Sequence, residues 1–287
     1  MSAMRILVID GNKAQVREAQ VAAGGSPSGE GYVKVLETLG AVHCEVVRPA
    51  DGEVRFEDPQ GVAGYDGVAI TGSALNVYDG GAHIERQIEL ARAVFAAGVP
   101  FFGSCWGLQV AVTAAGGRVR PNPRGREFGF ARRIELSDLG SRHAMFTGKP
   151  PVFEAITVHR DDVTELPEGA RVLAGSDMGV QAIELKSGRG TFWGAQYHPE
   201  YSFAEIAATA LRYGATLIEE GLFADRPELE SFVADLRALQ NNPRHRRLTW
   251  KHGLGPALQD ESVRLAELRN WLNLQVAPYA RRRARAP

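Results

Sequence analysis

The sequence has few of the features that mark exported, membrane-bound or disulfide-stabilised proteins. It contains only two cysteines, Cys44 and Cys105, in 287 residues, whereas small exported domains depend on many disulfides. This scarcity indicates a reducing, cytoplasmic setting. No segment approaches the ~20 consecutive apolar residues that a membrane-spanning helix needs, and the amino terminus lacks the pattern of a secretory signal. We therefore expect neither export nor membrane association.

Excess charge of one sign is also missing. The formal net charge is −1, and the chain is 44% hydrophobic and 23% charged, which is typical of globular proteins. The charge is uneven, because residues 221–287 carry 12 Lys and Arg against 7 Asp and Glu and end in an arginine-rich stretch. We expect a packed helical extension with a solvated end, or alternatively a docking surface for an acidic partner. No nucleic-acid-binding motif accompanies the charge, so nucleic acid is not expected as a partner.

Strand and helix patterns alternate through the first 117 residues. Apolar runs that end in polar or glycine-containing turns predict buried strands at 5–10, 43–47, 65–71 and 99–103. Apolar residues at helical spacing predict helices at 30–39, 82–97 and 106–115. Such alternation is typical of an α/β fold with an open, mostly parallel central sheet and helices on both faces.

The pattern changes in the rest of the chain. Short β-rich segments recur between residues 117 and 196, and a helix is expected at 203–220. The polar stretch 11–29 reads as a long loop with a functional role. We divide the chain into a main domain at 1–221 and a C-terminal helical extension at 222–287. Within the extension, Pro227 and Pro243 are expected to limit helices, and apolar spacing predicts one helix at 259–276.

The first chemical motif surrounds Cys105. The segment Gly103-Ser104-Cys105-Trp106-Gly107 places small residues two positions before and after the cysteine, where a buried strand turns into a helix. Side chains at those two positions would collide with neighbouring backbone in so tight a turn, and glycine avoids the collision. A thiol at a helix N-terminus is favoured as thiolate. The N–H of Trp106 could help to bind an oxyanion. Cys105 is therefore the candidate nucleophile, whereas Cys44 reads as a buried core residue.

The second motif supplies a base. His198 follows the predicted strand that ends near Gln196, and Glu200 lies two residues further on. A cysteine nucleophile needs a base that removes a proton and later returns it to the leaving amine. A carboxylate bonded to the distal ring nitrogen would set the tautomer and orientation of the histidine. Cys105, His198 and Glu200 are thus expected to form a catalytic triad.

Together the two motifs resemble those of class I (triad-type) glutamine amidotransferases. The signatures read Gly103-Ser104-Cys105-Trp106-Gly107-Leu108-Gln109 and Gln196-Tyr197-His198-Pro199-Glu200. The resemblance covers about residues 4–220, and the sequence pattern is most similar to that of the glutaminase part of GMP synthase. It implies a flavodoxin-like fold and hydrolysis of the glutamine side-chain amide through a thioester on Cys105.

Family resemblance also implies roles for other residues. The segment at Gly72 and Ser73 resembles the family's oxyanion strand, whose N–H would act together with that of Trp106. Gln109 would contact bound glutamine. The loop around Val158, His159 and Arg160 resembles the one whose backbone holds the α-carboxylate; these four residues are the predicted substrate-binding residues. Neither metal nor cofactor is implied.

Three functions fit these residues. The favoured one is release of ammonia from glutamine for a separate synthetase subunit, because the chain lacks a nucleotide-binding Gly-rich motif of its own. The alternatives are a stand-alone hydrolase of γ-glutamyl amides or peptides, and a non-catalytic regulatory homologue. Homo-oligomerisation is left open. Deletion of residues 281–287 is expected to leave glutaminase activity intact.

Overall fold

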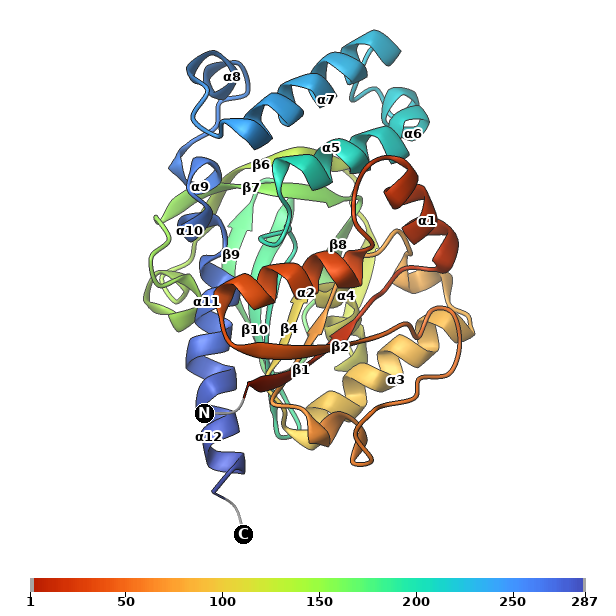
Figure 1. Ribbon diagram of the computed structural model, residues 1–287, viewed down its shortest axis with the longest axis vertical. Helices are drawn as coiled ribbons and strands as arrows, with labels where there is room; N and C mark the ends of the chain where they lie inside the picture. Colours follow the sequence, from red (N-terminus) through yellow and green to blue (C-terminus); the bar gives the residue numbers. More distant parts are fainter. Residues whose placement is uncertain (1–2, 286–287) are drawn as a thin grey trace.

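A computed structural model describes residues 3–285 of the chain, and a nine-stranded sheet forms its centre (Figure 1). The strand order is β2-β1-β3-β4-β11-β10-β9-β6-β7. The bounds of these strands are β1 (Met4–Ile9), β2 (Val42–Val47), β3 (Gly67–Ile70), β4 (Phe101–Ser104), β6 (Glu127–Leu136), β7 (Val152–His159), β9 (Ala170–Ser176), β10 (Gly179–Ser187) and β11 (Gly190–Ala195). A second, two-stranded sheet pairs β5 (Arg118–Pro121) with β8 (Asp161–Glu165).

The sheet has a parallel half and an antiparallel half. β1 pairs in parallel with β2 and β3, and β4 pairs in parallel with β3 and β11. From β11 onward through β10, β9, β6 and β7, all pairings are antiparallel. Because β4 and β11 are parallel neighbours, their carboxyl ends lie at the same edge of the sheet. This is the edge at which open α/β folds place their ligands.

Helices cover both faces of the parallel half. Leu7 and Ile9 of β1 belong to a core that includes side chains of α3 (Ala82–Ala97) and α4 (Trp106–Ala114). Ile6 and Val8 point to the opposite face and pack in a core with α2 (Ser28–Leu39). This alternation is the period-two pattern of a strand buried on both sides. The predicted α/β fold with helices on both faces is confirmed.

The stretch 11–29 contains a helix that the sequence reading missed. α1 (Ala14–Ala22) lies within this stretch, and its only buried residue is Gln20. Its alanine, glutamine, arginine and glutamate residues favour helix. It has no continuous apolar stripe, however, so the periodicity that identifies a surface helix is missing. The prediction of an uninterrupted loop was therefore wrong.

Helices α5–α8 form a third cluster over the outer face of β6 and β7. The predicted helix 203–220 is divided at Tyr213 into α5 (Phe203–Arg212) and α6 (Gly214–Glu219). Pro227 limits a helix as expected, because it lies at the start of one rather than within it. It occupies the first turn of α7 (Arg226–Asn241), where the missing N–H costs no hydrogen bond. The last helix of this cluster is α8 (Arg246–Lys251).

The C-terminal helices run along one side of the sheet (Figure 1). The predicted helix 259–276 is instead a series of short pieces. The range contains α10 (Glu261–Arg264), α11 (Ala266–Trp271) and a π-helical turn (Leu272–Val276), and it is flanked by α9 (Pro256–Gln259) and α12 (Ala277–Arg283). Leu268, Trp271 and Val276 are fully buried in the core that also contains α2. Within residues 3–285, no helix combines the length and hydrophobicity needed to cross a bilayer.

Short 3-10 helices complete the secondary structure of the connections. They are Gly61–Gly64, Val77–Asp79, Gly140–Arg142 and Ala144–Phe146.

Candidate active site

Cys105 lies in the tight turn between β4 and α4. Its backbone has φ 51° and ψ −103°, and among residues 3–285 only one other non-glycine residue, Arg133, has a positive φ. The flanking glycines explain how the turn fits. A Cβ on Gly103 would lie 2.6 Å from the carbonyl carbon of Gly107, and one on Gly107 would lie 2.5 Å from the Ile70 carbonyl oxygen. The collision predicted for larger residues is therefore present in the structure.

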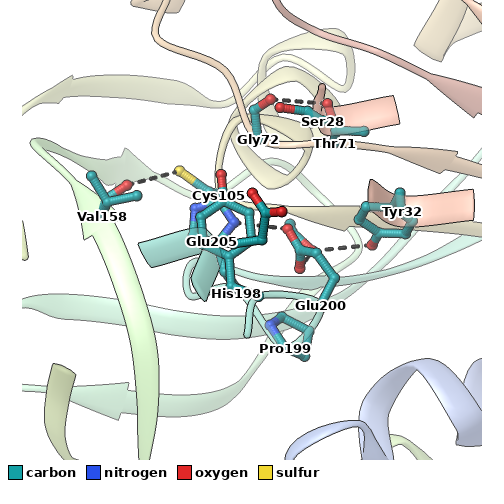
Figure 2. A network of polar contacts seen from close by, with 12 residues as sticks. Ser28, Tyr32, Thr71, Gly72, Cys105, Val158, His198, Pro199, Glu200 and Glu205 are labelled. Atoms are coloured by element: carbon teal, nitrogen blue, oxygen red, sulfur yellow. Dashed lines mark hydrogen bonds and ion pairs between the residues drawn. The ribbon is translucent and has the colours of Figure 1, made fainter. Parts of the chain in front are cut away.

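The thiol of Cys105 is almost fully buried and faces β7. The Cys105 N–H donates to the Ala195 carbonyl at 2.7 Å, which joins the turn to the end of β11. The sulfur lies 3.4 Å from the carbonyl oxygen of Val158, to which the thiol donates (Figure 2). Trp106 begins α4 immediately after Cys105. The thiol is thus at the N-terminus of a helix, as the motif predicts.

His198 and Glu200 lie in the turn that follows β11, beside Cys105 (Figure 2). The His198 N–H donates to the Ile156 carbonyl at 2.8 Å, and the ring Nδ1 lies 2.8 Å from Glu200 Oε1. The other ring nitrogen, Nε2, is buried and has no hydrogen-bond partner among residues 3–285. A carboxylate acceptor places the proton on Nδ1, which leaves Nε2 for proton exchange with a neighbouring group.

Two opposing effects set the protonation of His198. Burial lowers its pKa, because the charged ring is removed from water, but Glu200 and the adjacent Cys105 raise it by more. The net result is a pKa of about 10. The imidazolium is therefore the favoured form at neutral pH.

Two hydroxyl groups that the sequence reading did not single out hold Glu200. Ser104 donates from Oγ to Glu200 Oε2 at 2.8 Å, and its Oγ is 3.0 Å from the hydroxyl of Tyr32. Because the single proton of Ser104 goes to Glu200, Tyr32 must donate to Ser104. Burial raises the pKa of Tyr32 far above its usual value, so this proton stays in place. Glu200 is thus held through both carboxylate oxygens.

Gly72, one of the predicted oxyanion residues, lies against the catalytic histidine candidate. A Cβ on Gly72 would be 2.5 Å from His198 Cε1, so only glycine fits there without displacement. Its carbonyl is turned towards Thr71 (Figure 2) and accepts from Thr71 Oγ1 at 2.9 Å and from Asn12 Nδ2 at 3.2 Å. In a trans peptide, the N–H of Ser73 points the opposite way. The orientation of this peptide is therefore held by side-chain contacts.

The four predicted substrate-binding residues differ in their surroundings. Gln109 is buried and donates to Gln196 Oε1 at 3.4 Å, and Val158 lies against the Cys105 sulfur. Both ring nitrogens of His159 are engaged, by Glu127 Oε2 at 2.9 Å and by the Asp161 carbonyl at 3.0 Å. Arg160 is exposed. His159 is thus occupied by structural contacts, and its backbone remains the part predicted to hold a carboxylate.

A cavity of about 20 Å³ lies beside His198 and Gly72. It is large enough for about one water molecule. The ring of Tyr201 stacks on His198 at 4.0 Å, and the Arg212 guanidinium lies 4.3 Å from the Tyr213 ring at the same cavity. A substrate the size of glutamine therefore requires movement of this rim. Within residues 3–285, no cluster of His, Cys, Asp and Glu is arranged to hold a metal ion.

Known proteins resemble this chain at two levels of coverage. It is 34% identical to a γ-glutamyl-L-1-hydroxyisopropylamide hydrolase of a Pseudomonas species, across 99% of this chain and 97% of that protein. It is also 35% identical to GMP synthase of Porphyromonas gingivalis, but only across 51% of this chain and 27% of the synthase. A GMP synthase of Thermomicrobium roseum is 31% identical over 60% of this chain and 29% of the synthase. The chain thus spans just over a quarter of the length of these synthases.

Solved structures and a family model agree on the fold. A glutamine amidotransferase of Thermotoga maritima superposes with a TM-score of 0.67 at 17% identity, covering 96% of this chain and 99% of that one. A glutamine amidotransferase of Methylobacillus flagellatus gives a TM-score of 0.59 at 19% identity, covering 98% of this chain and 95% of that one. The family model "Glutamine amidotransferase class-I" matches residues 30–214. The chain therefore belongs to the class I glutamine amidotransferase family.

Proposed function

We propose that this protein hydrolyses the amide bond of a small γ-glutamyl amide, releasing glutamate and an amine. One observation carries this choice of substrate class. The resemblance to the γ-glutamyl-L-1-hydroxyisopropylamide hydrolase runs through essentially the whole of both chains, whereas the GMP synthases match only part of this chain. The order of preference reached from the sequence alone is thereby reversed, since ammonia supply was favoured there.

The proposed chemistry uses three side chains. The Cys105 thiolate attacks the γ-carbonyl carbon, and the resulting oxyanion is stabilised by backbone N–H groups of the Gly72–Ser73 turn and Trp106. His198 donates a proton to the amine nitrogen as the C–N bond breaks, which leaves a γ-glutamyl thioester on Cys105. His198 then removes a proton from water, which hydrolyses the thioester and restores the thiol. The hydrogen bond from His198 Nδ1 to Glu200 supports both proton transfers.

Substrate recognition is proposed to involve the backbone around Val158, His159 and Arg160, with Gln109 beside the bound chain. Because the cavity is only about 20 Å³, substrate must displace part of its rim. Tyr201 is the rim residue that covers the His198 ring. We keep the cytoplasm as the proposed compartment, because the chemistry needs Cys105 in its reduced form.

The proposal is tested by comparing amide substrates on the purified protein. Turnover of γ-glutamyl-L-1-hydroxyisopropylamide and simpler γ-glutamyl alkylamides should exceed turnover of glutamine, with glutamate and amine released in equal amounts. Cys105→Ala should abolish the activity. Cys44→Ala is the matched control, because burial raises the pKa of Cys44 to about 12 and it lies outside the site. Full activity of Cys105→Ala would overturn the proposal.

A second function remains supported by the partial match to GMP synthases. In that case glutamine is the substrate, and ammonia passes to a separate synthetase subunit. This function predicts weak hydrolysis of glutamine by the isolated chain and no preference for alkylamides. It also predicts a co-purifying synthetase whose substrates increase the glutaminase rate. The substrate panel therefore separates the two functions.

A further inference from the structure

Two side chains of the C-terminal helices contact the turn that carries His198 and Glu200. Arg264, the last residue of α10, donates from one terminal nitrogen to the carbonyl oxygens of Pro199 at 3.0 Å and Tyr201 at 2.5 Å. Glu267 of α11 accepts a hydrogen bond of 2.5 Å from the Tyr197 hydroxyl. Tyr197 and Pro199 are the immediate neighbours of His198 in the chain. The turn is therefore held on both sides of the histidine.

The charged groups that make these contacts are buried. Only 12% of the Arg264 side chain is exposed, and Glu267 is fully buried beside Lys149, whose Nζ lies 3.1 Å from the Glu267 carboxylate. Buried ion pairs add little net stability compared with apolar residues of the same size, because both charges must lose their hydration. They do impose a specific geometry. The arrangement thus suits positioning better than simple stabilisation.

The C-terminal helices that carry these groups rest on the strand before the nucleophile. Trp271 of α11 is fully buried, and its ring lies 5.9 Å from that of Phe102 in β4, which ends next to Cys105. Leu268 and Val276 are buried in the same core. The same segment therefore packs on the β4 side of the site and holds the turn after β11.

We propose that residues 261–276 act as a clasp that sets the His198–Glu200 turn relative to Cys105, with Arg264 and Tyr197 as positioning residues. This inference rests on the proposed catalytic role of the triad. The clasp lies outside the matched family segment 30–214. A guanidinium group forms a rigid planar fork, whereas a lysine ammonium is a point charge on a flexible stem. In Arg264 one terminal nitrogen binds both carbonyls while the other lies 3.4 Å from Glu261, and the single nitrogen of a lysine at position 264 cannot reproduce this two-sided arrangement.

The test compares Arg264→Lys, Arg264→Met and Tyr197→Phe with a matched control. Arg269 provides the control, because its guanidinium donates to the Ser262 carbonyl within the same segment and not to the turn. For the Arg264 and Tyr197 variants we expect kcat to fall about 10–100-fold, because small errors in alignment strongly slow catalysis. KM should change little. Arg269→Lys should match the wild type in kcat and KM.

The pH dependence of the rate separates positioning from general stability. If the clasp aligns Glu200 with His198, its loss weakens the interaction that raises the pKa of His198, and the limb of the kcat/KM profile that reports His198 moves to lower pH. A loss of thermal stability with an unchanged pH limb would overturn the inference, as would kcat values equal to that of Arg269→Lys. If Arg264→Met does not fold, the two conservative variants decide.

Failure of the proposed function has a different signature. Undiminished turnover by Cys105→Ala would reject the catalytic role of the triad itself. By contrast, an inactive Cys105→Ala together with fully active Arg264 and Tyr197 variants would leave the triad and reject only the clasp.

Discussion

Ser104 lies next to the nucleophile but acts on the opposite end of the triad. Its hydroxyl accepts from Tyr32 and donates to Glu200, so that the carboxylate keeps one oxygen for His198. We expect Ser104→Ala to lower kcat about tenfold, which corresponds to the loss of one hydrogen bond of ~1–1.5 kcal/mol. Steady-state kinetics would show this. Ser137→Ala, which removes a partly buried hydroxyl that donates to the Val172 carbonyl, is the control, and equal kcat values for the two variants would contradict the role of Ser104.

The raised pKa of His198 predicts how Cys105 responds to pH. Burial lowers the pKa of His198, but Glu200 and Cys105 together raise it by more, so the imidazolium beside Cys105 persists through neutral pH. In Glu200→Gln the pKa of His198 should fall. At pH values between the lowered and the original pKa, the His198 ring of this variant is neutral. The Cys105 thiolate then loses the positive charge beside it. Iodoacetamide should therefore alkylate Cys105 more slowly than in the wild type at pH 7–9, by ~10-fold or more. Identical rates in this range would refute the pairing.

At the scale of single residues, the sequence indicates the residues whose proposed role follows from a local pattern. Cys105 lies in a glycine-framed turn, and His198 and Glu200 share a single turn after a strand, and the structure brings these three together. Tyr32, Arg264 and Glu267 come from distant parts of the chain, and their roles depend on contacts that only folding creates. Ser104 lay within the motif, but its side-chain direction could not be read from spacing.

At the scale of elements, the turn between β4 and α4 depends on its two glycines. A methyl group on Gly103 or Gly107 would approach backbone atoms at 2.6 or 2.5 Å, and backbone cannot move as freely as a side chain. We expect Gly103→Ala to destabilise the protein by ~1–3 kcal/mol, the usual cost of overpacking, and to lower kcat at least tenfold. Gly52→Ala, which meets no atom within 4 Å, is the control. Denaturant unfolding and kinetics would measure both effects, and a Gly103→Ala protein as stable and active as Gly52→Ala would contradict the account.

Element prediction succeeded where one physical signal dominated. The helix predicted at 82–97 is α3 with the same bounds, because its apolar stripe and glycine cap agree. α1 was missed because its contacts are polar: Gln20 bonds to Thr209 Oγ1 and Arg212 Nε rather than packing in the core. The C-terminal run was predicted as one helix because periodicity does not register interruptions such as the π-helical turn.

At the scale of the whole molecule, the C-terminal helices are part of the core rather than an accessory. Deleting residues 281–287 removes Arg283, which contacts Asp66 at 3.2 Å and the Gly64 carbonyl at 2.8 Å, far from the site in sequence. Such partly exposed pairs contribute roughly 0–1 kcal/mol. We therefore expect this deletion to retain activity, with a melting temperature a few degrees lower. A loss of activity would show that the end of α12 has a further role.

A longer truncation should have a different result. Ending the chain at residue 260 removes four side chains from the core that also contains α2, namely Leu268, Trp271, Leu272 and Val276. Each such side chain contributes ~1.5–3 kcal/mol through burial, and together they approach the ~5–15 kcal/mol that stabilises a typical domain. We expect this truncated chain not to fold cooperatively. Circular dichroism and thermal unfolding would show it, and a sharp transition near that of the full chain would contradict the prediction.

The proposed function depends on covalent chemistry at Cys105. Acid quenching of the enzyme shortly after mixing with a γ-glutamyl alkylamide, followed by mass spectrometry of the intact chain and its peptides, would detect the intermediate. We predict a mass increase of one γ-glutamyl group on the peptide that contains Cys105, absent in Cys105→Ala and unaffected in Cys44→Ala. Turnover without any adduct in the wild type, accompanied by activity in Cys105→Ala, would contradict the mechanism.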